Sequence, residues 1–199
     1  MKILFVTSEA MPFIRTGGLG DVAGALPTSF LKLGQDARVI LPFYKDEIKS
    51  TYSDNFRFVG STYVELSWRK QYCGVYEAVY DGITYYFVDN EYYFKRKGLY
   101  GHFDDGERFA FFSKAVLEVL KLVDFYPDVL HAHDWQAALS VIYLRQKYSA
   151  DERYAGIRRV FTETPDVFDP RGYLAVARTE VKNMVKHKIV NVLGSSGTL

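Results

Sequence analysis

The stretch from Lys2 to Ala25 constrains the fold of this chain more than any other part of the sequence. It opens with four consecutive apolar residues, Ile3 to Val6, which is typical of a strand buried on both faces of a parallel sheet. A polar loop follows, and then a helical pattern that begins near Asp21. Between the loop and the helix lie Gly17, Gly18 and Gly20. Because glycines let a ligand approach the backbone and a helix start favours anions, we predict an anion-binding loop here.

The residues after this loop complete a strand–helix–strand unit. The helical pattern continues to Leu33, and Gly34 is a natural stop. Pro27 lies within the pattern, so it is expected to kink the helix or to mark its early turns. Residues 37–41 form the second buried strand, which Pro42 closes. Such a unit has a right-handed crossover between its two parallel strands.

The central part of the chain alternates between strand and helix patterns. Residues 56–88 are rich in β-formers and contain the hairpin signal Asp81-Gly82, which predicts an antiparallel excursion or a meander at the sheet edge. Residues 90–105 are expected to be a loop. The remaining patterns predict a helix at 107–122, a strand at 129–133, a helix at 135–148 and a strand at 158–162. The predicted class is α/β, with a mostly parallel sheet and flanking helices.

The pattern changes from about Glu163. A helix is expected to start at Asp169-Pro170, with apolar residues spaced by three and four. These are Leu174, Ala177, Val181, Met184, Val185 and Ile189. A flexible end follows at residues 194–197. We therefore predict a domain of residues 1–162 and an appended tail of residues 163–199 with one amphipathic helix.

Composition limits the partners and the compartment. A net charge of +1 gives no general attraction to nucleic acid or to anionic membranes, so neither is an expected partner. No signal peptide and no apolar segment long enough to span a membrane is apparent in the sequence. The single cysteine, Cys73, excludes an internal disulfide and is interpreted as a small strand residue. These features favour a cytoplasmic protein.

The glycine cluster allows two interpretations. Residues 18–23 fit the dinucleotide pattern G-x-G-x-x-A. However, the loop from Ser8 to Thr16 is too long for the tight first turn of a dinucleotide fold, and the second strand ends without an acid for a ribose hydroxyl. The alternative is a phosphate or carbohydrate loop, with the neighbouring Arg15 as a charged partner. For Arg15 itself, a solvated loop cation is the other interpretation.

A second candidate site lies at residues 131–136, HAHDWQ, at the carboxyl end of a predicted parallel strand. Open α/β sheets bind their ligands at such ends. Metal binding by His131 and His133 lacks a third ligand, so no metal or cofactor is predicted. Asp134 is expected to cap the following helix, and His131 could be a core histidine. Together with the glycine loop, these residues favour a sugar or nucleotide site.

Three segments resemble the amino-terminal domain of bacterial glycogen synthase and plant starch synthase, over roughly residues 1–162. They are KILFVTSEAMPFIRTGGLGDVAGALP, DNEYYFKRKGLYGHFDDGERFAFFSKAVLE and PDVLHAHDWQAAL. The resemblance implies a Rossmann-like domain that is one half of the GT-B arrangement. It also implies transfer of glucose from ADP-glucose to the non-reducing end of an α-1,4-glucan, with retention of configuration and without a metal.

The resemblance also implies roles for single residues. Asp134 would lie near the transferred glucose as the catalytic residue. Arg15 stands where the family usually has a lysine near the donor phosphates, and an arginine there keeps the charge but changes the geometry. The implied substrate-binding residues are Arg15, Gly17, Gly18, Asp21 and His133.

Two departures from the family pattern are visible. The family continues after its V-F-T strand with a histidine-asparagine motif, whereas this chain has Glu163-Thr164-Pro165. The family's carboxy-terminal domain is also missing from this sequence. The tail DVFDPRGYLAVARTEVKNMVKHKIVNVLGSSG instead resembles the carboxy-terminal helix of class II fructose-bisphosphate aldolase, a segment that carries no zinc-binding histidine.

The sequence therefore predicts a glucosyltransferase of the glycogen synthase type that is truncated and inactive alone. The alternative is a non-catalytic half-domain, or fusion remnant, that binds glucan or nucleotide. A nicotinamide oxidoreductase is disfavoured by the missing ribose-binding acid. Homodimerisation through the tail helix is a further expectation, because half of a two-domain enzyme exposes a surface that its partner domain normally covers.

Overall fold

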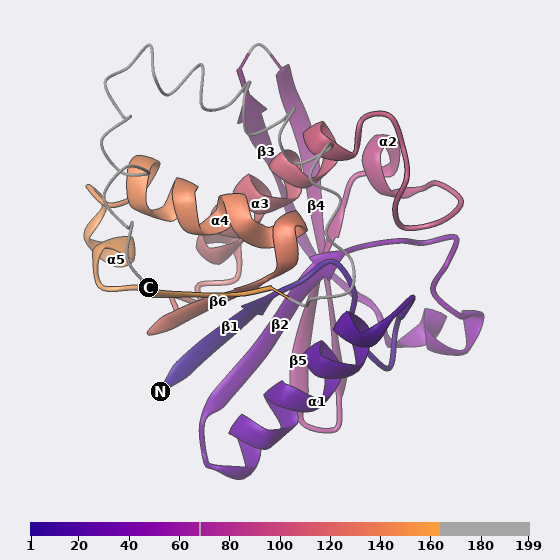
Figure 1. Cartoon of the computed structure of the whole chain (residues 1–199), viewed down its shortest axis with the longest axis horizontal. Helices are drawn as coiled ribbons and strands as arrows, with labels where there is room; N and C mark the ends of the chain where they lie inside the picture. Colours follow the sequence, from indigo (N-terminus) through magenta and orange to yellow (C-terminus); the bar gives the residue numbers. More distant parts are fainter. Residues whose placement is uncertain (68, 164–199) are drawn as a thin grey trace.

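The computed structural model describes residues 1–67 and 69–163, which form a seven-stranded sheet with helices on both faces (Figure 1). The strands are β1 (Lys2–Val6), β2 (Asp36–Pro42), β3 (Arg57–Leu66), β4 (Arg69–Tyr80), β5 (Ile83–Asp89), β6 (Val129–His133) and β7 (Arg158–Thr162). The helices are α1 (Gly18–Lys32), α2 (Glu91–Phe94), α3 (Asp105–Leu122), α4 (Asp134–Lys147) and α5 (Glu152–Ala155), with a 3-10 turn, η1, at Ser50–Asn55.

The strand order is β3-β4-β5-β2-β1-β6-β7. The five strands from β5 to β7 run parallel to one another, whereas β3 and β4 extend the sheet as an antiparallel ribbon. Asp81 and Gly82 join β4 to β5 with φ angles of 48° and 78°. Positive φ at both central residues is the signature of a tight hairpin turn, so the predicted hairpin is confirmed. The predicted fold class, a mostly parallel sheet with an antiparallel excursion at its edge, is also confirmed.

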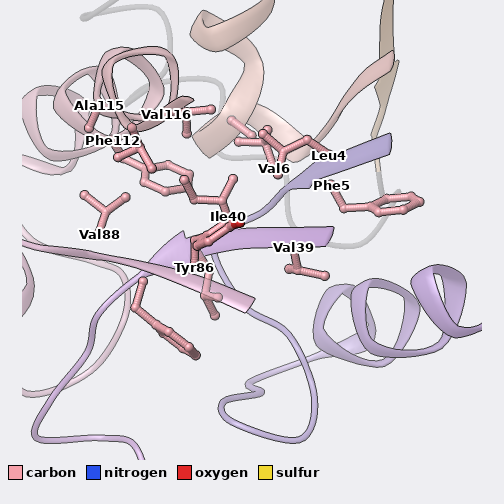
Figure 2. Packing of buried hydrophobic residues seen from close by; sticks show 14 of the residues in the cluster. Leu4, Phe5, Val6, Val39, Ile40, Tyr86, Val88, Phe112, Ala115 and Val116 are labelled. Atoms are coloured by element: carbon pink, nitrogen blue, oxygen red, sulfur yellow. The ribbon is translucent and has the colours of Figure 1, made fainter. Parts of the chain in front are cut away.

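The core lies on both faces of the central strands. Figure 1 shows α1 on one face of the sheet and α3 and α4 on the other. In Figure 2, Ile40 and Val88 lie below Phe112, Ala115 and Val116 of α3. On the opposite face, the ring of Phe5 lies 5.7 Å from the ring of Phe30 in α1. Residues 3–6 of β1 and 39–41 of β2 are buried and apolar because both of these faces are covered.

Several element boundaries differ from the sequence patterns. Helix α1 begins at Gly18, one turn before the expected start at Asp21, because the preceding loop packs against its first turns. Pro27 is buried well past the early turns of that helix. The expected loop at 90–105 contains the short helix α2. Cys73 is a buried residue of β4, as predicted.

The predicted tail helix and flexible end lie outside the described residues. No helix that the structure describes is both long enough and apolar enough to cross a membrane.

Candidate functional site

The candidate site lies where the order of the parallel strands reverses. β1 is hydrogen-bonded to β2 on one side and to β6 on the other. The chain leaves β1 toward α1 on one face and leaves β6 toward α4 on the other face (Figure 1). The carboxyl ends of β1 and β6 therefore lie at the position where open α/β sheets bind ligands.

The loop after β1 is fixed to α1 by close backbone contacts. The N–H of Met11 donates to the carbonyl of Gly20 over 3.0 Å. A Cβ atom at Gly20 would lie 2.8 Å from Cγ of Arg15, and one at Gly24 would lie 2.8 Å from the carbonyl oxygen of Met11. Because such approaches are too short for a side chain, these two glycines are required for the loop to pack against the helix.

Gly17 and Gly18 are different from Gly20 and Gly24. A Cβ atom at either position would have no neighbouring atom within 4 Å among the described residues. Gly17 is the N-cap of α1 and, as a glycine, offers no side chain to accept the N–H groups of the first turn. Packing among the described residues does not require glycine at these two positions, whereas close approach of a ligand to the backbone would require it.

The two charged residues predicted beside this loop are in contact with each other. The guanidinium of Arg15 donates to a carboxylate oxygen of Asp21 over 2.7 Å, and both side chains are about half exposed. This hydrogen bond, together with the negative charge of Asp21, raises the pKa of Arg15 above its ordinary value. Arg15 is therefore a fixed cation at the start of α1.

Glu9 lies directly behind this loop and is only 3% exposed. Its carboxylate accepts hydrogen bonds from the backbone N–H of Thr16 and from the Thr16 hydroxyl, the latter over 2.9 Å. Burial raises the pKa of Glu9, the hydrogen bonds from Thr16 oppose that rise, and the charge of Asp134 adds to it. The coupling between Glu9 and Asp134 places the β1 loop and the start of α4 in one electrostatic environment.

The two histidines of β6 stack on each other with ring centroids 4.2 Å apart. His131 is partly exposed and forms a 2.8 Å hydrogen bond through Nε2 with the hydroxyl of Thr162. His133 is 1% exposed, and burial, with a smaller contribution from His131, lowers its pKa to about 4. Within the described residues, no three His, Cys, Asp or Glu side chains are grouped so that they could hold a metal ion.

Asp134 is the first residue of α4, not its cap. The N-cap is His133, and no side-chain hydrogen bond caps the helix there. The expected capping role was wrong because the helix begins one residue earlier than the pattern indicated. Asp134 is 4% exposed and has a φ of 58°, a left-handed conformation that is costly for a residue other than glycine. Such strained conformations in buried polar residues are concentrated at functional sites.

Three further polar residues support this site and were not singled out in the sequence. They are Glu9, Tyr100 and Arg108. The hydroxyl of Tyr100 lies 2.7 Å from the hydroxyl of Ser8, in the loop after β1. Arg108 is fully buried and donates to the carbonyls of Tyr93 and Leu99 over 2.7 Å and 3.2 Å. The sequence gives one indication for Glu9: it is a charged residue only three positions after a buried strand, where a functional side chain is expected.

A hollow of about 410 Å³ adjoins the glycine loop. Its lining residues are Met11, Pro12, Phe13, Ile14, Arg15 and Thr16 of the loop, together with Glu47, Lys49, Tyr52 and Leu99. Glu47 is held in place by the N–H of Gly98, which donates to its carboxylate over 2.6 Å. The hollow therefore combines a carboxylate, two cations and two aromatic rings beside the loop.

Comparisons with known proteins agree on one family. The model of the starch synthase catalytic domain matches residues 2–163. The glycogen synthase of Anoxybacillus flavithermus is 51% identical over 162 residues, which are 81% of this chain and 33% of that protein. The glycogen synthase of Bacillus cereus is 53% identical over 162 residues, with 81% of this chain and 34% of that protein covered.

A solved structure agrees with the sequence comparisons. The catalytic domain of starch synthase IV from Arabidopsis thaliana, bound to ADP and acarbose, superposes with a TM-score of 0.74 at 26% identity. The superposition covers 81% of this chain and 33% of that one. This chain spans about a third of the length of the curated relatives that it matches. The resemblance expected over residues 1–162 is thus confirmed, and the chain belongs to the starch synthase catalytic-domain family.

Proposed function

We propose that this chain supplies the amino-terminal part of a glycogen synthase-type glucosyltransferase, and that the carboxyl ends of β1 and β6 bind the nucleotide sugar ADP-glucose. The observation that carries this proposal is the open space beside Gly17 and Gly18, next to the cation Arg15. A diphosphate needs N–H donors and a positive charge, and this helix start combines both. The ADP in the starch synthase IV structure supports the same ligand class.

The glucose of the donor would lie toward the end of β6. Asp134 is buried there in its left-handed conformation, and His133 lies next to it. A buried carboxylate at this point can accept hydrogen bonds from sugar hydroxyls and can stabilise positive charge that develops on the sugar during transfer. We propose Asp134 as the catalytic residue and His133 as a residue that contacts the sugar.

The acceptor would be an α-1,4-glucan in the hollow beside the glycine loop. Tyr52 offers an aromatic surface for a sugar ring, and Glu47 and Lys49 offer an acceptor and a donor for its hydroxyls. The acarbose bound to starch synthase IV, an oligosaccharide analogue, supports a glucan in this family of domains.

Binding and transfer make different demands. Transfer requires stabilisation of the departing diphosphate from both sides of the cleft. The curated relatives are about three times as long as the matched region, and their remaining residues have no counterpart in the described chain. We therefore expect residues 1–163 to bind ligand without synthase activity. The second candidate function, a glucan- or nucleotide-binding module, differs in that no added domain would restore transfer.

Calorimetric titration of the purified chain with ADP-glucose, and then with maltoheptaose, tests the proposal. We expect ADP-glucose to bind and Arg15→Ala to weaken it about fivefold or more, because one charge-assisted contact is lost. Arg153→Ala is the matched control: Arg153 also forms an exposed ion pair, with Asp151 at 2.6 Å, but it lies in α5. Equal effects of both variants, or no heat with either ligand, would refute the proposed site.

A further inference from the structure

We infer that Glu9 is a positioning residue of the proposed nucleotide-sugar site, and that it fixes the glycine loop from directly behind the place where the donor phosphates bind. This inference rests on the proposed function. It adds a residue with no contact to the ligand, whose role is to hold the atoms that do make contact.

The geometry of Glu9 shows how the loop is held. Thr16 lies between Arg15 and Gly17, the two residues proposed to face the phosphates. Both hydrogen-bond donors of Thr16, its N–H and its hydroxyl, are directed at the same carboxylate oxygen of Glu9. With both donors engaged, Thr16 has little freedom to rotate, and the neighbouring Arg15 and Gly17 share its restriction.

In the part of the chain that the structure describes, the other hydrogen bonds of the loop do not involve Thr16. The loop is held further back by the hydrogen bond from Met11 to Gly20. Tyr85 also donates to the carbonyl of Met11, over 3.3 Å. These contacts fix the middle of the loop. At the end of the loop nearest to the glycines, Glu9 holds Thr16, and the ion pair with Asp21 holds the side chain of Arg15.

The charge of Glu9 distinguishes this role from simple packing. Burying a carboxylate costs free energy, and a neutral amide of the same shape would also accept the hydrogen bonds from Thr16. Packing alone therefore does not require a charged residue at this position. Four titratable or charged groups act on Glu9: Arg15 from its own loop, Tyr44 after β2, Tyr100 before α3, and Asp134 of α4. A bound diphosphate would add negative charge beside this cluster. Binding should therefore draw a proton onto Glu9.

The test is calorimetric titration with ADP of the unsubstituted chain and four variants. Glu9→Ala removes the carboxylate and should weaken ADP binding about tenfold or more, because the loop is no longer held in the binding geometry. Glu9→Gln keeps an acceptor of the same shape and should recover most of that loss. Thr16→Val removes only the hydroxyl and should have an intermediate effect, whereas Thr16→Ser keeps both donors and should match the unsubstituted chain.

A second measurement separates positioning from a general loss of stability. At mildly acidic pH, titrations in two buffers with different ionisation enthalpies give the number of protons taken up on binding. The unsubstituted chain should take up more protons than Glu9→Gln. If Glu9→Ala does not fold, Glu9→Gln and Thr16→Val still provide the comparison.

The outcomes are distinguishable from failure of the proposed function. If the unsubstituted chain does not bind ADP, the proposed function fails and this inference fails with it. If the unsubstituted chain binds but Glu9→Ala or Thr16→Val binds equally well, only the inference on Glu9 is overturned. Equal proton uptake by the unsubstituted chain and Glu9→Gln overturns the placement of Glu9 behind the phosphates.

Discussion

Arg15 and Asp21 lie on opposite sides of the glycine cluster and are joined by a 2.7 Å hydrogen bond between guanidinium and carboxylate. The cation proposed to bind the donor phosphates is therefore already paired, and an incoming diphosphate must compete with Asp21. The pair is about half exposed, so this competition is modest.

Replacing Asp21 with asparagine should consequently strengthen nucleotide binding. Asp21→Asn releases Arg15 and removes one negative charge near the phosphates. We expect ADP to bind about two- to fivefold more tightly, since exposed ion pairs are worth about 0–1 kcal/mol. Calorimetric titration at low salt measures the effect, and it should shrink as salt screens the charges. Weaker ADP binding by the variant would show instead that Asp21 itself holds the donor.

Replacing a glycine of the loop with alanine should have opposite effects at Gly18 and at Gly20: the first should lose ADP affinity and the second should lose stability. A methyl group at Gly18 has open space, so Gly18→Ala should fold with undiminished stability but lose ADP affinity, because the methyl group occupies the path of the ligand. At Gly20 the methyl group would lie 2.8 Å from Arg15, so Gly20→Ala should lower the melting temperature. Thermal unfolding and ADP titration of both variants check this pair. Loss of stability in Gly18→Ala with unchanged affinity would contradict it.

Much of the fold was predictable because local signals and packing agree. Residues 3–6 of β1 and 39–41 of β2 are apolar runs, as is typical of strands buried on both faces. The Asp81-Gly82 turn was predictable because few residue pairs adopt positive φ twice in succession. The candidate residues of the β1 loop and of the end of β6 were predictable because they follow strands that the pattern already identified.

The parts that were missed depend on contacts without a local sequence rule. Arg15 and Asp21 are six residues apart, and no helical or strand spacing predicts that they meet. Asp134 resembled an ordinary helix cap, and only the backbone shows that it is the first helical residue in a left-handed conformation. The burial of Arg108 was not predictable from the helix pattern. Its guanidinium is satisfied by the carbonyls of Tyr93 and Leu99, which lie in the segment before α3, and no local sequence rule indicates these contacts.

Arg108 should be among the most sensitive positions for stability. It is fully buried between the rings of Phe94 and Phe109, and it also pairs with Asp105. Arg108→Met would remove the donor of one carboxylate oxygen of Asp105 and of two loop carbonyls, which should lower the free energy of unfolding by about 3–5 kcal/mol. Urea denaturation measures the loss.

The matched control is Arg57→Met, because Arg57 is 67% exposed and forms a surface ion pair with Glu77. Loss of this ion pair should lower the free energy of unfolding by no more than about 1 kcal/mol. If both variants lose the same stability, Arg108 does not hold the segment before α3 in the way that its hydrogen bonds indicate.

His133 makes stability depend on pH below neutrality. Its pKa in the folded chain is about 4, against a reference value of 6.5, so the unfolded chain takes up a proton in the window between these values while the folded chain does not. Stability should therefore fall as the pH falls from 6.5 to about 4, by about 3 kcal/mol at most. Glu9 has the opposite effect on stability. Because its pKa is raised in the folded chain, the folded chain holds a proton above pH 4.5 that the unfolded chain has lost, so the contribution of Glu9 to stability decreases as the pH rises above 4.5.

The contribution of His133 is isolated by comparison with His133→Phe. Neither ring nitrogen of His133 has a hydrogen-bond partner among the described residues, so phenylalanine removes the titration without removing a hydrogen bond. Urea denaturation of both proteins across this pH window should show a smaller loss of stability in His133→Phe. The control His102→Phe, in the segment before α3, should keep the original pH dependence. If His133→Phe keeps it as well, the buried histidine is not the group that titrates, and the loss at acidic pH arises elsewhere in the chain.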